Sequence, residues 1–571
     1  MSVDARAVAA GWLVRFDAAV RAGDAAAVGA LFAPDSWWRD LVALTWDLRS
    51  QQGAEAVGQR LSAAATAAGA RDFVLAAGRE PVAVGAGGTV RVQAFVEFAT
   101  AAGRGTGVLR LVRDNGADAA SGRPTRGLGD AASGTWRAWT FLTALDSLDG
   151  FPAGVGADGD PAVLVVGAGQ CGLALAARLG RLGIPTVLVE RNARVGDNWR
   201  QRYRSLVLHD PVWFDHLPYL PFPESWPVFA PKDSLADWLE SYASAMGLDV
   251  WCSAGIEAAA YDEAAARWVV DVRRADGSLR RLRPAHLVLA TGLNGAPVVP
   301  DLPGAPDFAG LVCHSSGFPS GRDWAGRNAV VVGTGSSAHD IAEELHHAGA
   351  AVTVLQRSPS YVLSREHATK VLFAGLYEAG GPPTEDADLL AAATPYPLAV
   401  VLRRRTTKLL ADLDAELLAG LAKAGFGLDF GPTGGGILEL VLSRGGGYYI
   451  DTGASRLIVD GRIALRRGEI ARLTPAGVRL ADGAELPADV VVLATGFRSM
   501  RSAARAVLGD AVAARCGPVW GLDDTGELQG MWRRTGQPGL WFMGGNLQMG
   551  RLYSRYLALQ IAAVEAGLLT W

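Results

Sequence analysis

Cysteine is scarce in this chain, with only four among 571 residues. No two of them form a Cys-x-x-Cys pair, which is the spacing found in zinc ribbons and dithiol redox centres. The sequence therefore predicts no metal site and disfavours a disulfide reductase. Few cysteines also suit a reducing compartment, so we expect the protein in the cytoplasm. The cysteines are Cys171, Cys252, Cys313 and Cys516.

Three further absences narrow the class of protein. No uninterrupted apolar run reaches the ~18 residues that would predict a membrane-spanning helix, so we expect no membrane partner. The net charge is -4 and no basic run occurs, so we expect no nucleic-acid partner either. The first residues lack a charged stretch followed by an apolar one, which predicts no signal peptide.

The chain is long and rich in hydrophobic residues. With 571 residues, 50% of them hydrophobic, it predicts about two to four domains with large cores. A stretch rich in glycine, proline and aspartate separates residues 1–148 from an α/β pattern that continues to residue 571. We interpret residues 149–160 as the linker.

The N-terminal domain begins with a helical pattern. Residues 5–32 have apolar positions at helical spacing, and Trp12 and Phe16 share one face. A loop that contains Trp37 and Trp38 is expected to follow.

Strand-like runs complete this domain, and the last alternates as expected of a sheet with one wet face. Helices followed by an antiparallel sheet predict an α+β domain. The pattern resembles the NTF2-like (SnoaL-like) cone, which holds a ligand in some proteins and only pairs in others. We favour a non-catalytic role for this domain, and whether Asp35, Asp40 and Asp47 line a pocket stays open. The strands are expected at 90–98, 107–113 and 135–143, with a loop at 115–134.

Two glycine-rich turns follow apolar runs in the α/β part. In the first, Gly167 permits a sharp turn, Gly169 leaves room for a pyrophosphate beside the backbone, and Gly172 allows close packing of the next helix. That helix aims its free N–H groups at the phosphates. Glu190 ends the second strand near the ~20-residue offset of an acid that binds a ribose hydroxyl. We interpret Cys171, within the turn, as a small apolar filler.

The second turn contains Gly333 and Gly335, with Ala338 in place of a third glycine. Its second strand ends in Arg357, and a guanidinium binds a 2′-phosphate that a carboxylate would repel. This site is therefore predicted to prefer NADPH, although Arg357 as a solvated surface charge stays an alternative. Asp340 is expected to cap its helix or bond to the backbone. Two dinucleotide sites suit an enzyme that passes hydride from a nicotinamide to a flavin.

Further motifs carry a family resemblance. Phe308, Gly310, His314 and Phe318 match the pattern Phe-x-Gly-x-x-x-His-x-x-x-(Tyr/Phe) just ahead of the second turn. With the two turns, this pattern resembles the fingerprint of flavin-containing monooxygenases, the class B flavoproteins. We interpret His314 as structural. Segments 195–199, 203–209, 449–453 and 493–497 also resemble family motifs, and they favour the YUCCA-like branch.

The resemblance implies an architecture of two Rossmann-like dinucleotide-binding domains. An FAD-binding domain at 161–317 and 481–571 is expected to be interrupted by an NADPH-binding domain at 318–480. A helical insert is expected at about 398–426, packed over the sheet.

The resemblance also assigns residues to the two cofactors. The residues predicted to bind FAD are Gly167, Ala168, Gly169, Gln170, Cys171, Gly172, Glu190, Arg191, Asn198, Trp199, His209, Asn546, Leu547 and Gln548. Those predicted to bind NADPH are Gly333, Thr334, Gly335, Ser336, Ser337, Arg357, Thr495 and Gly496. His209 and Asp210 stand where many members carry an Asn-Thr pair, which makes them the catalytic candidates.

The chemistry that the resemblance implies needs no acid pair or triad. NADPH reduces FAD, O2 adds to form a C4a-(hydro)peroxyflavin, and one oxygen atom passes to a small organic substrate. N- or S-oxygenation and attack on a carbonyl or 2-oxo acid both stay open. So does an NADPH oxidase or reductase that oxygenates nothing. Residues 212–222 either line the substrate entrance or simply pack, and a homodimer is left open.

Overall fold

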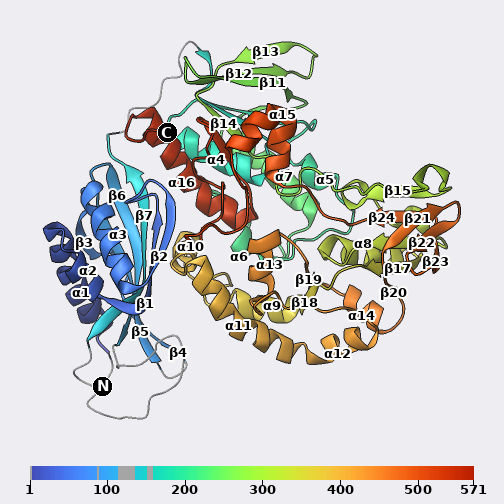
Figure 1. Ribbon diagram of the computed structural model, residues 1–571, viewed down its shortest axis with the longest axis horizontal. Coiled ribbons are helices and arrows are strands. Elements are labelled where there is room, and N and C mark those ends of the chain that lie inside the picture. Colours follow the sequence, from blue (N-terminus) through green and yellow to red (C-terminus); the bar gives the residue numbers. More distant parts are fainter. Residues whose placement is uncertain (1–2, 87–88, 114–134, 151–158) are drawn as a thin grey trace.

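The computed structural model describes residues 3–86, 89–113, 135–150 and 159–571. It contains an N-terminal unit and two Rossmann-like units, which we call the first and the second. The N-terminal unit, blue in Figure 1, lies beside α10 (Thr384–Ala392) and the C-terminal helix α16 (Leu547–Glu565). The loop predicted at 115–134 and most of the predicted linker lie outside the described residues.

The N-terminal unit is an α+β domain, as predicted. Its seven-stranded sheet has the order β2-β1-β7-β6-β5-β3, with β4 paired to β5. Helix α1 covers one face, and its Trp12 and Phe16 join Phe32, Phe73 and Phe141 in an aromatic core. The elements are α1 (Ala5–Ala22), α2 (Ala25–Ala30), β1 (Phe32–Leu41), β2 (Leu48–Gln52), α3 (Ala54–Ala67), β3 (Arg71–Leu75), β4 (Val82–Ala86), β5 (Thr89–Ala99), β6 (Gly103–Arg113) and β7 (Trp136–Leu148).

Two predictions for this unit were wrong. The single helix at 5–32 is broken at Gly23, which adopts a left-handed conformation (φ 65°) and ends α1. The predicted loop at Trp37 and Trp38 is instead part of β1, which pairs with both β2 and β7. Trp38 is buried, and its indole N–H donates to Thr143 Oγ1 at 3.0 Å. Pairing with a strand distant in sequence therefore makes this segment a strand rather than a loop.

The carboxyl groups of Asp40 and Asp47 serve the structure of this unit. Asp40 is fully buried and accepts hydrogen bonds from the hydroxyls of Thr45 and Thr143 and from two backbone N–H groups. Burial raises the pKa of Asp40 to about 6, although these hydrogen bonds oppose the shift. Asp47 pairs with Arg533 of the first Rossmann unit at 2.7 Å. These two carboxyl groups therefore hold the β1–β2 turn and a domain contact.

The first Rossmann unit contains a five-stranded parallel sheet in the order β10-β9-β8-β14-β25. Helices α4 and α16 pack together against it, because α4 is apolar along nearly its whole length. The elements are β8 (Val163–Val166), α4 (Gln170–Arg181), β9 (Thr186–Val189), α5 (Asp197–Arg200), α6 (Val212–Asp215), α7 (Lys232–Ala245), β10 (Asp249–Trp251), β11 (Gly255–Asp262), β12 (Arg267–Arg273), β13 (Leu279–Leu282), β14 (His286–Leu289), α15 (Met500–Arg515), β25 (Leu540–Phe542) and α16.

The second Rossmann unit has its own parallel sheet in the order β15-β24-β16-β17-β20. Its elements are β15 (Leu311–His314), β16 (Asn328–Val332), α8 (Ser336–His347), β17 (Ala351–Gln356), β18 (Tyr361–Ser364), α9 (Arg365–Leu372), α10, α11 (Tyr396–Leu413), α12 (Ala415–Lys423), α13 (Gly436–Arg444), β19 (Tyr448–Asp451), α14 (Ala454–Val459), β20 (Ala464–Arg467), β21 (Ile470–Thr474), β22 (Gly477–Leu480), β23 (Glu485–Pro487) and β24 (Val490–Leu493).

Strand pairing moves the domain boundaries inferred from the sequence. β15 precedes residue 317 and β24 follows residue 480, yet both pair within the second sheet. The chain therefore enters the second unit before β15 and leaves it after β24. Helices α11 and α12 cover the residues of the helical insert expected at about 398–426, but α11 packs on α9, α12 and α13 rather than over the main sheet. Among the described residues, no helix combines the length and apolarity needed to span a bilayer.

A buried polar network fastens the N-terminal unit to the rest of the chain. The Arg39 guanidinium forms a two-bond ion pair with Glu527, both bonds at 2.7 Å, and also donates to Tyr553 of α16 and to the Ala392 carbonyl of α10. Both charged side chains are 2% exposed or less. Ser50 donates to the same Glu527 at 2.6 Å. The N-terminal unit is thus packed on helices that belong to both Rossmann units.

Candidate active site between the two glycine turns

The first glycine turn has the geometry that its sequence predicts. Gly167 has φ 107°, and a Cβ there would lie 2.5 Å from the Ala290 carbonyl oxygen. A Cβ on Gly172 would lie 2.0 Å from the Gly167 carbonyl oxygen. At Gly169, by contrast, a Cβ would meet only the Asn198 amide, at 3.5 Å. The backbone is therefore packed on one side and open at the start of α4, which is the cradle that a pyrophosphate needs.

Glu190 stands beside this turn at the end of β9. Its Oε2 accepts from the Ala168 N–H at 2.9 Å, and its Oε1 accepts from the backbone and side-chain N–H groups of Asn192. The carboxylate therefore braces the turn and the loop after β9. A carboxylate oxygen accepts more than one hydrogen bond, so these contacts leave capacity for a ribose hydroxyl. The neighbouring Arg191 is exposed.

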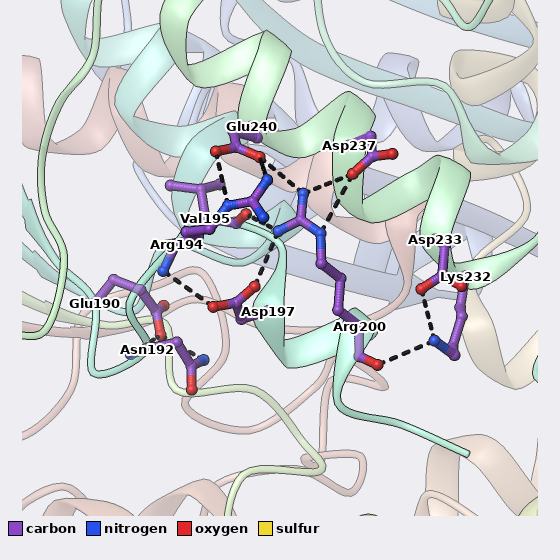
Figure 2. Close-up of polar contacts among 10 residues, drawn as sticks. All are labelled: Glu190, Asn192, Arg194, Val195, Asp197, Arg200, Lys232, Asp233, Asp237 and Glu240. Atoms are coloured by element: carbon purple, nitrogen blue, oxygen red, sulfur yellow. Dashed lines mark hydrogen bonds and ion pairs between the residues drawn. The ribbon is translucent and has the colours of Figure 1, made fainter. Parts of the chain in front are cut away.

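An ionic network holds the loop between β9 and α5 against helix α7 (Figure 2). Arg200 pairs with Asp197, Asp237 and Glu240, at 3.0, 2.7 and 2.8 Å. Arg194 forms a second pair with Glu240. Single exposed pairs contribute ~0–1 kcal/mol each, but a network with the half-buried Arg200 at its centre holds one loop geometry.

This loop places Asn198 and Trp199 at the glycine turn. The Trp199 indole N–H donates to Gln170 Oε1 at 3.4 Å, and its ring packs against the cores of both Rossmann units. Gln170 is the first residue of α4. The structure therefore brings together the residues predicted near the first turn, although they come from separate motifs.

The start of α16 faces the same turn. Asn546 caps this helix, since its Oδ1 accepts from the Met549 N–H at 2.9 Å. Cys171 is buried, lies within 3.5 Å of the Gly545 carbonyl oxygen, and has its pKa raised to about 12 by burial. It is therefore a packing residue, as predicted. A second helix N-terminus thus lies beside the first.

The second glycine turn repeats this geometry at the start of α8. Gly333 has φ 120°, and a Cβ there would lie 2.5 Å from the Ala494 carbonyl oxygen. Thr334 Oγ1 lies 2.7 Å from Ser360 Oγ, so its hydroxyl is engaged by the protein. Arg357 is exposed at the end of β17 and has no side-chain partner among the described residues. It is placed where a guanidinium is free to bind an anionic ligand.

The fingerprint histidine is structural. The Ser316 N–H donates to His314 Nδ1 at 3.1 Å, which leaves Nε2 as the donor to the Gly496 carbonyl oxygen, also at 3.1 Å. Burial lowers the pKa of His314, so the neutral ring is favoured. His314 thus joins β15 to the Ala-Thr-Gly turn, while Thr495 donates to the Val298 carbonyl. Thr495 and Gly496, the two residues of that turn predicted to bind NADPH, are therefore held where the chain passes between the two Rossmann units.

Contacts with α8 were missed at the sequence level. Tyr203 donates to Asp340 Oδ2 at 2.7 Å, and His209 Nε2 lies 3.3 Å from the same oxygen. Asp340 therefore bonds to side chains of the first unit, and the prediction that it caps its helix was wrong. The Arg202 guanidinium donates to Ser337 Oγ at 3.2 Å, beside the second glycine turn. The Tyr-x-x-Leu-x-Leu-His spacing was the only signal for this contact.

His209 and Asp210 are partly exposed and lie among charged side chains. Burial lowers the pKa of His209, but contact with Asp340 outweighs burial and the net shift is upward. Burial raises the pKa of Asp210 to about 6, although His209 opposes this shift. Both shifts favour the protonated forms of these two neighbouring groups, which suits a site that holds and releases protons.

The aromatic segment 212–222 is clamped to α16. Arg551 forms a two-bond ion pair with Asp388 of α10, at 2.7 and 2.8 Å, and donates to the Phe214 and His216 carbonyls. The predicted flavin contact Gln548 donates to the same Asp388 at 3.3 Å, so its amide is engaged by the protein. These contacts show that the segment packs on α16.

Comparison of the sequence with known proteins identifies the family of this chain. The family profile of pyridine nucleotide-disulphide oxidoreductases matches residues 164–372. Indole-3-pyruvate monooxygenase YUCCA1 of Oryza sativa subsp. japonica is 36% identical over 340 residues, which cover 59% of this chain and 77% of that protein. The chain belongs to the YUCCA-like class B flavin monooxygenases. Probable indole-3-pyruvate monooxygenase YUCCA4 of Arabidopsis thaliana is 32% identical over 340 residues, 59% of this chain and 76% of that protein.

This monooxygenase also has the fold of distant structures. The OTEMO complex with FAD and NADP has a TM-score of 0.53 and 20% identity, and the likeness covers 72% of this chain and 85% of that one. An ε-caprolactone-bound cyclohexanone monooxygenase has a TM-score of 0.52 and 17% identity, covering 71% and 88%. With the YUCCA relatives, this makes the protein an NADPH-dependent FAD monooxygenase that oxygenates small molecules with O2. The prediction of class and cofactors is confirmed.

Proposed function

We propose that this monooxygenase attacks the carbonyl carbon of a small 2-oxo acid and releases the shortened carboxylic acid. In that reaction one oxygen atom of O2 enters the new carboxyl group, the old carboxyl group leaves as CO2, and the other oxygen atom leaves as water. The observation that carries the proposal is the likeness over 340 residues to enzymes named for indole-3-pyruvate, which is a 2-oxo acid.

The two turns supply the cofactor sites of the proposal. FAD is held by the first turn, by Glu190, and by the segments around Trp199 and Asn546. NADPH is held by the second turn, with Arg357 at its 2′-phosphate. The open backbone at Gly169 and the exposed Arg357, which has no side-chain partner in the described part of the chain, support this assignment. FAD, once reduced by NADPH, supplies the activated oxygen.

The protein's own side chains then position the substrate, exclude water and hold protons. The Asp210 carboxyl and the His209 imidazole belong to consecutive, largely buried residues, and each can hold a proton beside the reacting atoms. Burial also keeps bulk water from the reacting atoms, which suppresses loss of oxygen as peroxide.

The N-terminal unit in this proposal is an NTF2-like cone without chemistry of its own. Its interior is filled by stacked and edge-on aromatic rings, which supports a packed core rather than a ligand pocket. We place the linker at 149–160, and a homodimer stays open to measurement of mass in solution.

Product analysis tests the proposed reaction. The purified yellow protein is reduced with NADPH under argon, and air is then admitted with a 2-oxo acid, a ketone, an amine or a thioether. The expected result is one shortened acid and one CO2 per NADPH with the 2-oxo acid, and little peroxide. Oxygenation of only the amine or thioether contradicts the proposed substrate class. Peroxide equal to NADPH consumed with every compound would instead support an oxidase.

The role of Arg357 is tested by comparing the two nicotinamide cofactors. Replacing it in Arg357→Ala removes the guanidinium proposed to bind the 2′-phosphate. We expect KM for NADPH to rise about 10-fold or more, with KM for NADH unchanged. Steady-state NADPH and NADH oxidation measures both constants, and Arg404→Ala, an exposed site on α11, is the matched control. An unchanged KM for NADPH as well as for NADH would mean that Arg357 is only a solvated charge.

A further inference from the structure

One face of α8 is hydrogen-bonded to a short segment of the first Rossmann unit, residues 202–209, which we call the strap. Three α8 side chains spaced three and four residues apart share this face. Each accepts a hydrogen bond from the strap. The contacts are Arg202 to Ser337 Oγ at 3.2 Å, Tyr203 to Asp340 Oδ2 at 2.7 Å, and the Ser205 N–H to Glu344 Oε2 at 2.9 Å. The strap thus joins the first unit by direct hydrogen bonds to α8, the helix that follows the second glycine turn.

Asp340 occupies the centre of this face. It accepts from Tyr203 and lies 3.3 Å from His209 Nε2, so one carboxylate oxygen holds two groups of the other unit. Its second oxygen is buried and has no hydrogen-bond partner among the described residues. A buried carboxylate needs compensation for its lost hydration. The imidazole of His209 is the titratable group that can supply a positive charge directly against it.

We propose that Asp340 is a positioning residue that holds the His209 imidazole, and that this contact fixes the second Rossmann unit against the first while NADPH passes hydride to FAD. The inference rests on the proposed cofactor sites but not on the proposed substrate. Asp340 acts through His209 and touches neither cofactor in this scheme.

The contact depends on pH because His209 carries a full charge only when protonated. The net pKa shift of His209 is upward from its ordinary value of ~6.5. The charge-assisted contact is therefore complete below that ordinary value and is lost as pH rises through the folded-state pKa. The titratable and charged groups around the pair are Asp210, Arg365, Arg202, His339, Glu343, Asp451 and Tyr449, whose ring centroid lies 6.4 Å from that of His209.

Two readouts across about pH 5.5 to 9 test the proposal. The first is the rate of flavin reduction by NADPH under argon, and the second is amide hydrogen exchange of residues 202–209 without NADPH. Wild-type protein is expected to reduce faster and exchange more slowly on the acid side of the His209 titration. In Asp340→Asn we expect both profiles to lose this step, with reduction about tenfold slower at low pH. Asp340→Glu is expected to restore part of the step.

Control variants separate positioning from general damage. His347→Asn removes an exposed titratable group on the same helix and is expected to keep the wild-type profiles. Tyr203→Phe removes the uncharged partner of Asp340 and is expected to keep the pH step while shifting the rate. If Asp340→Asn does not fold, His209→Asn carries the test, since it must also abolish the step.

A wild-type pH profile in folded Asp340→Asn, or in His209→Asn, overturns the proposal. Neither readout requires oxygen transfer to a substrate. Failure to oxygenate any 2-oxo acid would therefore defeat the proposed substrate class while leaving this test intact.

Discussion

The Gly167→Ala variant is expected to purify colourless, with less than about a tenth of the wild-type FAD content. At φ 107° a side chain strains the backbone, and its Cβ would lie 2.5 Å from the Ala290 carbonyl oxygen. Strain of this kind costs about 1–3 kcal/mol before the contact is counted. The carbonyl belongs to backbone after β14 and cannot rotate away as a side chain would. The turn must therefore shift, and the N–H groups at the start of α4 shift with it.

Gly180→Ala is the matched control for this substitution. Gly180 lies on α4, the helix that follows the turn, and a Cβ there meets nothing within 4 Å. Alanine in a helix is more stable than glycine by about 0.5–1 kcal/mol, so this variant should bind FAD normally and melt slightly higher. The visible spectrum and thermal melting of both proteins provide the measurement. Normal FAD content in Gly167→Ala would mean that the first turn does not hold the flavin.

Local signals explain why the two turns were predictable. Gly167 and Gly333 have φ of 107° and 120°, which glycine adopts far more readily than any other residue type, and each follows a short apolar strand. The information therefore sits within about ten residues of chain. The same holds for His314, whose partners are its neighbour Ser316 and a second recognisable turn at Gly496.

Partners distant in sequence explain what was missed. Trp37 and Trp38 follow turn-forming residues and were assigned to a loop, yet β7 pairs with them more than a hundred residues later. Asp340 was interpreted as a helix cap because nothing near it in sequence needs a carboxylate. Its true partners, Tyr203 and His209, lie in the other unit. The sequence alone does not show which residues far apart along the chain lie close together in the fold.

Arg39→Met is expected to weaken attachment of the N-terminal unit by about 3–5 kcal/mol, because it leaves the Glu527 carboxylate buried without its cation. The wild-type pair is 2% and 1% exposed, so water cannot replace the guanidinium. The loss should reach the flavin, since Arg39 also donates to Tyr553 of α16, and the start of this helix lies against Cys171 of the first glycine turn. We therefore expect a lower melting temperature together with easier release of FAD.

The double variant Arg39→Met/Glu527→Met distinguishes a lost pair from an uncompensated charge. Replacing both partners of a buried ion pair with apolar side chains is often neutral, so most of the melting temperature should return. Arg49→Met, at a guanidinium 44% exposed and 3.4 Å from Asp47, is the control and should change stability by less than about 0.5 kcal/mol. If Arg39→Met melts and holds FAD like wild type, the N-terminal unit is a separable module. If the single variant loses stability and FAD, and the double variant recovers the wild-type melting temperature, the N-terminal unit is part of the structure that supports α16.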